Sequence, residues 1–264
     1  MNDIPKIKLG SILISLLEPK PGHEQEVHRW YERDHIYAGC MIGENFFSSR
    51  RWIATRQLKK LRFPQESPIT EDISQGSYLT IYWLLHGRYE QALDWSVKQV
   101  NQLHAQNRME PPRTNISSGF YQYDWGSFRD DDGVPAELAL EHPYKGVAMT
   151  FIDSRKDVNP VQLESQYRAA LDTVQARSKC AMSLCLKNLP LPNNAPSYIP
   201  RIPEAITAKR SLLLHFFEED PIDCWQDFID DFSAILADTE CADIVLAAPF
   251  LPTIPGTDIY VDQL

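Results

Sequence analysis

The order of the predicted strands and helices occurs twice along this chain, and this repeat constrains the fold more than any other feature. Hydrophobic periodicity predicts strand, helix, strand, strand, helix, strand over residues 1–128 and the same order over 143–264. A long loop is predicted at the same place in each half, over 56–76 and 190–205, and an acidic, turn-rich linker over 129–142. The halves share little sequence identity, so the repeat depends on order and spacing.

One such unit folds into a four-stranded antiparallel sheet with two helices on one face. The other face of the sheet is then left bare. Two units in one chain can cover each other by pressing these bare faces together. We therefore predict an α+β protein of two ferredoxin-like lobes, whose sheets face each other in a closed or nearly closed barrel with the helices outside.

Composition and charge exclude several classes of function. Of the 264 residues, 43% are hydrophobic and 23% are charged, as in ordinary globular proteins. The formal net charge of -10 and the pI of about 5.2 argue against binding to nucleic acid or to an anionic membrane surface. The N-terminus lacks the pattern of a signal peptide, and no apolar run reaches the roughly 18 residues of a membrane helix. Five scattered cysteines without a CxxC pair indicate reduced thiols, so a cytoplasmic protein is expected.

The stretch VHRWYERDHIYAG, residues 27–39, concentrates groups that can transfer protons. His28, Tyr31 and His35 are spaced three and four residues apart, which places them on one stripe of a helix. An imidazole titrates near neutrality, so His35 can take or give a proton. His28 has charged neighbours and is predicted to be exposed, and Asp34 is predicted to point about 100° away from His35, towards solvent.

The strand SYLTIYWLLHG presents a mixed face of phenol, hydroxyl and imidazole groups on an otherwise apolar wall. Residues on that face alternate along the strand: Tyr78, Thr80, Tyr82, Leu84 and His86. Such a face is typical of a small-molecule pocket, but it also suits a sheet face shared between the two lobes. Tyr121 and Tyr123, on one side of the last strand of the first half, leave the same two readings open.

Trp30, Tyr31 and His35, followed by a strand with Arg50 and Arg51, resemble the dimeric α+β barrel superfamily, and within it the EthD-like domains. The resemblance in motif covers about residues 9 to 60. It departs from the EthD-like pattern after His35, where a proline is usual and this chain has HIYAGCMIGEN. The resemblance implies enzymes of many kinds: cofactor-independent monooxygenases, polyketide cyclases, decarboxylases, dehydratases, isomerases and tandem-repeat haem enzymes. A fold shared so widely does not by itself fix the reaction.

Our leading hypothesis is a cofactor-independent lyase or cyclase that dehydrates, decarboxylates or closes a ring on an aromatic or polyketide-like substrate. His35 is predicted to be the general acid or base, with Tyr31 beside it; no metal or cofactor is expected. The predicted substrate-binding residues are Trp30, Tyr37, Arg51, Tyr82, His86 and Tyr121. Because the second half has no equivalent of the Trp-Tyr-His run, the site belongs to the first half. The chain is then a monomeric pseudo-dimer or a homodimer that binds a small molecule.

Two alternatives stay open. The first is a haem-dependent or oxygen-using enzyme on the same tandem scaffold, with His215 in LLLHFF as a possible axial ligand. A lone histidine in an apolar strand is more often a satisfied core residue. The second is a non-catalytic ligand-binding module, which a structure without a cavity beside His35 would favour. The sequence has no GxGxxG, Walker or GxSxG motif and no cluster of zinc ligands.

Overall fold

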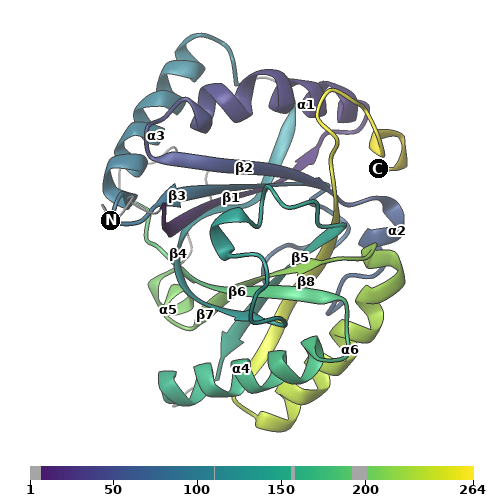
Figure 1. Ribbon diagram of the computed structural model, residues 1–264. Helices are drawn as coiled ribbons and strands as arrows, with labels where there is room; N and C mark the ends of the chain where they lie inside the picture. The colour runs from purple at the N-terminus through teal and green to yellow at the C-terminus, as the bar shows by residue number, and fades with distance from the viewer. Residues whose placement is uncertain (1–6, 110, 156–157, 192–200, 202) are drawn as a thin grey trace.

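A computed structural model of the chain describes residues 7–109, 111–155, 158–191, 201 and 203–264 (Figure 1). The strands are β1 (Leu9–Pro19), β2 (Phe46–Ile53), β3 (Tyr78–Leu85), β4 (Arg113–Phe128), β5 (Gly146–Ser154), β6 (Cys180–Asn188), β7 (Arg210–Phe217) and β8 (Ala242–Pro252). The main helices are α1 (Glu24–Trp30), α3 (Tyr89–Ala105), α4 (Pro160–Gln175) and α6 (Pro221–Thr239). Shorter turns of helix are η1 (Tyr31–His35), η2 (Tyr37–Met41), α2 (Arg56–Lys59), η3 (Ala136–Leu138), α5 (Glu204–Thr207) and η4 (Val261–Gln263).

The eight strands form one closed antiparallel barrel. Their order around it is β1-β3-β2-β8-β5-β7-β6-β4, and β4 pairs back with β1. Each half therefore has the ferredoxin-like strand order, with its first strand between its third and fourth. The halves meet at two seams: a short one between β2 and β8, at Trp52 and Ile53, and a longer one between β4 and β6. The predicted α+β fold with two facing ferredoxin-like sheets is confirmed.

Alternation along the strands separates the barrel interior from the helix-covered outer face. On β3, Leu79, Ile81 and Trp83 belong to the large interior core, whereas Tyr82 and Leu84 pack in a separate cluster towards α3 and the turns after α1. Both faces of the strand are buried, which explains its near-continuous apolar sequence. Burying this much apolar side chain is the main stabilising term of the fold.

Helices cover the barrel on two opposite sides (Figure 1). α1 and α3 lie over the strands of the first half, and α4 and α6 lie over those of the second half. α6 starts cleanly because Asp220 accepts a hydrogen bond from Ile222 N at 2.9 Å and Pro221 occupies the first turn. Its aromatic side chains Trp225 and Phe228 are fully buried against the second half of the barrel.

The segment 129–142, predicted as a linker, packs against the barrel. Ala136, Ala139 and Leu140 are buried in the interior core, and Trp83 Nε1 donates to the Ala136 carbonyl at 3.0 Å. The segment is turn-rich, but it is not a solvated connection. The division of the chain into separate domains at 128 and 143 stays a prediction.

The predicted long loop over 56–76 begins with the short helix α2 and is pinned by Arg62. The buried Arg62 side chain donates to the carbonyls of Ile73, Gln75 and Gly76. Of the loop predicted over 190–205, residues 192–200 and 202 lie outside the described residues. No helix in the described ranges has the length and apolar character needed to cross a membrane.

The C-terminal residues after β8 return to the first half of the chain and lie against α1, as Figure 1 shows. The Thr257 carbonyl lies 2.8 Å from His28 Nε2, and Asp258 forms an ion pair with Arg29. His28 is fully buried beneath this segment. The sequence-based prediction that His28 is exposed is therefore wrong, because the covering residues lie more than 200 positions away in the sequence.

Candidate active site

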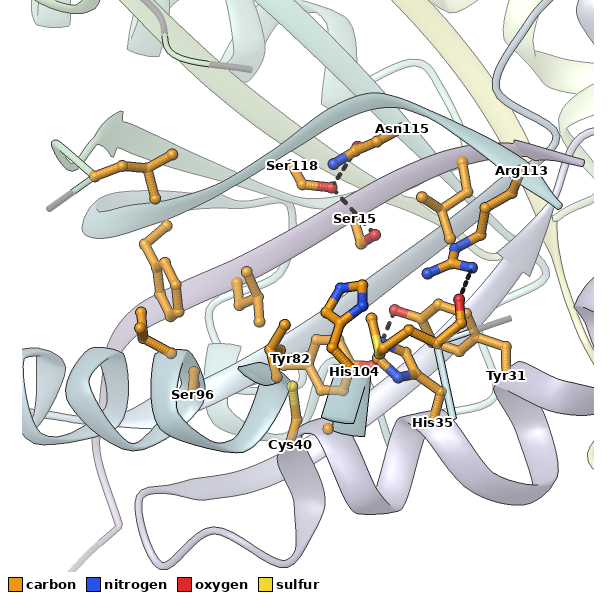
Figure 2. A pocket seen from close by; sticks show the side chains of 18 of the residues that line it. Ser15, Tyr31, His35, Cys40, Tyr82, Ser96, His104, Arg113, Asn115 and Ser118 are labelled. Carbon is orange, nitrogen blue, oxygen red and sulfur yellow. Dashed lines mark hydrogen bonds between the residues drawn. The ribbon is translucent and has the colours of Figure 1, made fainter. Parts of the chain in front are cut away.

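A cavity of about 600 Å³ lies between the outer face of the first-half sheet and the helices that cover it (Figure 2). β1, β3 and β4 provide one wall, and η1, η2 and α3 provide the other. Much of the lining is apolar: Leu13, Leu17, Leu93, Val97, Val100, Met109, Pro111, Pro112, Phe120 and Leu191. A few polar groups within such a lining are typical of a site for a largely apolar small molecule. A structure without a cavity beside His35 would have favoured a non-catalytic module, and this structure has such a cavity.

The helix that carries the Trp-Tyr-His run changes its winding at the cavity. α1 continues without a break into the π-helical turns η1 and η2, and the backbone N–H of Ile36 bonds to the carbonyl of Tyr31, five residues back. Such π-turns are uncommon and are frequent at functional sites. Outside the turn, Asp34 forms an ion pair with Arg108, and Trp30 Nε1 donates to the Arg108 carbonyl at 2.8 Å. These bonds fix the turn against the loop after α3.

His35 lines the cavity as a neutral imidazole. Its ring stacks on Trp30 at 4.4 Å between centroids and meets the edge of Tyr31 at 4.9 Å. Nδ1 is buried and has no hydrogen-bond partner among the described residues. Burial, and next the charge of Arg113, lower the pKa of His35 to about 3. At neutral pH the ring therefore carries a free lone pair, and its protonated form becomes favourable only when a negative charge develops beside it.

Gly39 leaves the space that the His35 ring occupies. A Cβ atom at this position would lie 3.0 Å from Cε1 and 3.3 Å from Nδ1 of His35. Carbon atoms at rest are separated by about 3.5–4.0 Å, so any other residue here would displace the ring. The glycine and Trp30 together define where the imidazole lies in the cavity.

Two buried phenols face the cavity beside His35. Tyr82 donates from its hydroxyl to the Tyr31 hydroxyl at 3.1 Å, and both side chains line the cavity. Burial raises the pKa of both tyrosines, so both stay protonated at neutral pH. Burial also raises the pKa of the nearby Cys40 to about 12. This thiol is therefore protonated at neutral pH.

Polar side chains continue along the opposite wall on β1 and β4 (Figure 2). Ser118 Oγ lies 3.2 Å from Ser15 Oγ and 2.8 Å from Asn115 Oδ1. Ser15 and Ser118 also face each other in the register of the two strands. The wall thus offers hydroxyl and amide groups that can orient oxygen atoms of a ligand.

The structure brings together some of the residues predicted from the sequence. His35, Tyr31 and Tyr82 line the cavity. Trp30 and Arg51 do not line it, but they contact residues that do: Trp30 stacks on His35, and the Arg51 guanidinium lies 5.0 Å from the centre of the Tyr31 ring. These five residues form one connected group.

Three predicted substrate-binding residues lie elsewhere. Tyr37 is 57% exposed and His86 is exposed, and neither lines the cavity. Tyr121 is buried in the core inside the barrel, on the other side of the sheet. Alternation along a strand assigns residues to two faces, but it does not tell which face points into the barrel. The sequence therefore could not show that Tyr121 points into the barrel and away from the cavity.

Several residues at the cavity were not predicted, among them His104 on α3 and Arg113 at the start of β4. Arg113 Nη1 donates to the carbonyls of Met109 and Pro111 at 2.6 and 2.8 Å, and its guanidinium lies 4.3 Å from the centre of the Trp30 ring. The sequence did contain a signal for the opposite wall, because Ser15 interrupts an apolar strand.

The surroundings of His215 do not fit haem, the cofactor of the tandem-repeat alternative. His215 is fully buried, and its Nδ1 lies 2.8 Å from Ser183 Oγ. The rings of Phe228 and Phe232 lie 4.9 and 5.6 Å from it between centroids. An axial histidine needs an open plane beside its free nitrogen for the macrocycle. Here aromatic side chains pack directly against the imidazole.

The cavity at His35 also suits haem poorly. The two propionates of haem need cationic or other strong donors. Among the described lining residues, Arg113 is the one arginine or lysine, and two main-chain carbonyls already bind it. The described residues also contain no group of three histidines, cysteines or acids that could hold a metal ion.

No protein-family model and no curated protein matches the sequence. Solved structures match the fold over nearly the whole chain. An anthrone oxidase-like protein aligns with a TM-score of 0.56 and 8% identity, over 96% of this chain and 95% of that one. A chlorite dismutase-like protein aligns at 0.54 and 10%, over 97% and 100%. The encapsulated DyP-type peroxidase of Mycobacterium smegmatis aligns at 0.52 and 10%, over 99% and 97%.

At this identity the likeness shows the fold, which is that of the dimeric α+β barrel proteins. The finer likeness to EthD-like domains stays a prediction. The comparison also corrects the predicted activity. The names of the three proteins describe an oxidase, a dismutase and a peroxidase, and none is a lyase or a cyclase. The prediction of a cofactor-independent lyase or cyclase is therefore wrong.

Proposed function

We propose that this protein is an oxygen-using oxidoreductase that oxidises an activated C–H group of a flat, largely apolar substrate carrying a ketone or phenol oxygen. The observation that carries the proposal is the neutral His35 imidazole in an apolar cavity, beside the hydrogen-bonded hydroxyls of Tyr31 and Tyr82. The fold likeness to an anthrone oxidase-like protein supports this substrate class. We also propose that the run of Trp30, Tyr31 and His35 corresponds to the run found in EthD-like domains.

The reaction starts with the transfer of a proton from carbon to His35. Loss of this proton turns the ketone into an enolate, whose charge resides largely on oxygen, where hydroxyl donors can stabilise it. The imidazolium and the enolate then stabilise each other, which offsets the low basicity of the buried ring. Proton transfer by a positioned side chain contributes about 10² to 10⁴ in rate.

The enolate is electron-rich and supplies electrons to molecular oxygen. A C–O bond forms at the deprotonated carbon, and His35 returns its proton to give a hydroperoxide. Loss of water from the hydroperoxide breaks the O–O bond and leaves a carbonyl. The balance is CH₂ plus O₂ to C=O plus H₂O, with the methylene carbon oxidised and dioxygen reduced. The apolar lining protects the intermediates from water.

A cytoplasmic location and a monomeric or homodimeric state stay predictions alongside this proposal. In one chain, the second half of the barrel covers the sheet that a partner subunit would otherwise cover. Every described residue that lines the cavity, except Leu191, comes from the first half of the chain.

The test is oxygen uptake by the purified protein with anthrone as the probe substrate. Wild-type protein should consume oxygen well above the rate of the protein-free solution, and His35→Asn should lose about 10²-fold or more in kcat. The matched control is His23→Asn, because His23 is half-buried just before α1, does not line the cavity, and its ring bonds only to Glu26 among the described contacts. Equal activity in the two variants would refute the role of His35, and a Soret band in active wild-type protein would refute a reaction carried by the residues alone.

A further inference from the structure

Arg51 is a buried cation without an acidic partner in the described part of the chain. Its side chain on β2 is 4% exposed. Nη1 donates to the His28 carbonyl at 3.1 Å and lies 3.4 Å from His28 Nδ1, while Nε and Nη2 have no hydrogen-bond partner. Glu32 attracts the guanidinium but makes no ion pair with it, and instead accepts a hydrogen bond from Gly256 N at 3.0 Å.

A charge in this position is unfavourable unless a negative charge approaches it. Removing a guanidinium from water costs several kcal/mol, and proteins normally offset this with a paired carboxylate. Arg51 instead lies against two phenol rings, with the centre of Tyr31 at 5.0 Å and that of Tyr78 at 5.2 Å from its central carbon. Such contacts with aromatic rings offset only a small part of the desolvation. Because no described carboxylate forms an ion pair with the guanidinium, an anion bound nearby would be stabilised by its charge.

The neighbours of Arg51 lead directly to the cavity. Tyr31 separates the guanidinium from the cavity, and its hydroxyl accepts from Tyr82. In the sheet, Arg51 on β2 lies opposite Thr80 on β3, which lies opposite Ser15 on β1. The cation thus stands at one end of a polar row whose other end lines the cavity.

We propose that the cavity holds the substrate oxygen as an anion once the substrate has lost a proton, with Tyr31 donating to that oxygen, Tyr82 donating to Tyr31, and Arg51 stabilising the charge from behind. Arg51 is a positioning residue, because it acts through Tyr31 and does not touch the substrate. The substrate class is a phenol or an enolisable ketone, which can lose a proton to give an oxygen anion. This inference deepens the proposed function and rests on the same cavity, but it makes a claim about binding that does not require oxygen.

The test uses 4-nitrophenol, which absorbs at longer wavelength as its anion, and nitrobenzene, which has a similar size and no proton to lose. Wild-type protein should bind 4-nitrophenol as the phenolate at a pH below its solution pKa. Arg51→Met should weaken phenolate binding about 10- to 100-fold, since charges several ångströms apart in a protein interact by a few kcal/mol. The affinity of Arg51→Met for nitrobenzene should differ from that of the wild type by less than 3-fold.

The matched control is Arg50→Met on the neighbouring residue of β2. Arg50 points to the other side of the sheet, where it donates to the carbonyls of Leu140 and His142. The substitution Arg50→Met should leave the spectrum of bound 4-nitrophenol the same as in the wild type. Arg51→Lys keeps the charge and should keep the bound probe ionised. Because Arg51→Met removes an uncompensated buried charge, its melting temperature should equal or exceed that of the wild type.

Binding of the neutral phenol by wild-type protein would overturn the inference, and so would equal phenolate affinity in Arg51→Met. A lower melting temperature in Arg51→Met with unchanged probe ionisation would assign Arg51 a structural role instead. If Arg51→Met does not fold, the wild-type spectrum still decides whether the probe binds as an anion, and loss of the ionised probe in Arg51→Lys would refute the role of the charge at this position. An ionised probe in a protein that consumes no oxygen would refute the proposed oxidation and leave the anion site standing.

Discussion

Gly39→Ala should separate the position of the His35 ring from the stability of the fold. The added Cβ would lie 3.0 Å from Cε1, 3.3 Å from Nδ1 and 3.4 Å from Nε2 of His35. Restoring an ordinary contact of about 3.5–4.0 Å moves the ring by roughly half an ångström. Catalytic groups tolerate about 0.5 Å of misplacement, and about 1 Å can cost 10²-fold in rate. We therefore expect kcat for anthrone oxidation to fall about 10-fold.

The same substitution should leave the protein folded. Alanine is favoured over glycine in a helix by about 0.5–1 kcal/mol, which offsets the local crowding. The melting temperature should stay within about 3 °C of the wild type. The control is Gly43→Ala, where the new Cβ would meet the Cys40 carbonyl oxygen and the Trp95 ring at 3.0 Å, with no atom of His35 among its three nearest contacts. Unchanged kcat in Gly39→Ala, or an equal loss in Gly43→Ala, would refute the argument that Gly39 positions the imidazole.

Three further substitutions test other parts of the account. Tyr31→Phe should lower kcat about 100-fold, as expected for the loss of one donor to a developing oxygen anion, and unchanged steady-state kinetics would contradict that role. His28→Asn removes the 2.8 Å contact with the Thr257 carbonyl and should lower the free energy of unfolding in urea by about 1–3 kcal/mol; a silent variant would show that the C-terminal segment adds little. Burial lowers the pKa of His215 to about 3, whereas an unfolded histidine titrates near 6.5. The unfolded chain therefore binds this proton first, and His215 should reduce stability by up to about 1.4 kcal/mol per unit as pH falls from about 6.5 towards 3. His215→Leu should reduce the dependence of unfolding free energy on pH, measured by denaturation at several pH values. The same dependence in the variant and the wild type would contradict this role of His215.

The fold could be predicted because two physical signals agreed along the chain. Period-two alternation marked the strands and an amphipathic period marked α3, α4 and α6, and the bare sheet faces then required a closed barrel. The seams of the barrel could not be predicted, since no local pattern in β2 and β8 specifies that two residue pairs join them. The packing of 129–142 on the barrel was missed for a similar reason: its acidic composition masks three buried side chains around Ala136.

The sequence predicted those residues of the candidate site that follow from the pattern of a single helix or strand. Tyr31 and His35 came from helical spacing and Tyr82 from strand alternation, and all three line the cavity. The π-turns after Trp30 carry no sequence signal, so the close approach of Gly39 to His35 emerged only from the structure. Burial of His28 depends on residues that follow β8, far away in the sequence.

The central claim is that the cavity at His35 inserts oxygen from O₂ into its substrate, and isotope labelling tests it most directly. Purified wild-type protein is given anthrone under ¹⁸O₂ in unlabelled water, with His35→Asn and a protein-free sample beside it, and the product is analysed by mass spectrometry. The account predicts that wild-type protein forms product with one ¹⁸O atom in the new carbonyl, one O₂ consumed per product molecule and a rate about 10²-fold or more above His35→Asn. A carbonyl that carries unlabelled oxygen from the outset, or a wild-type rate equal to that of His35→Asn, would contradict it.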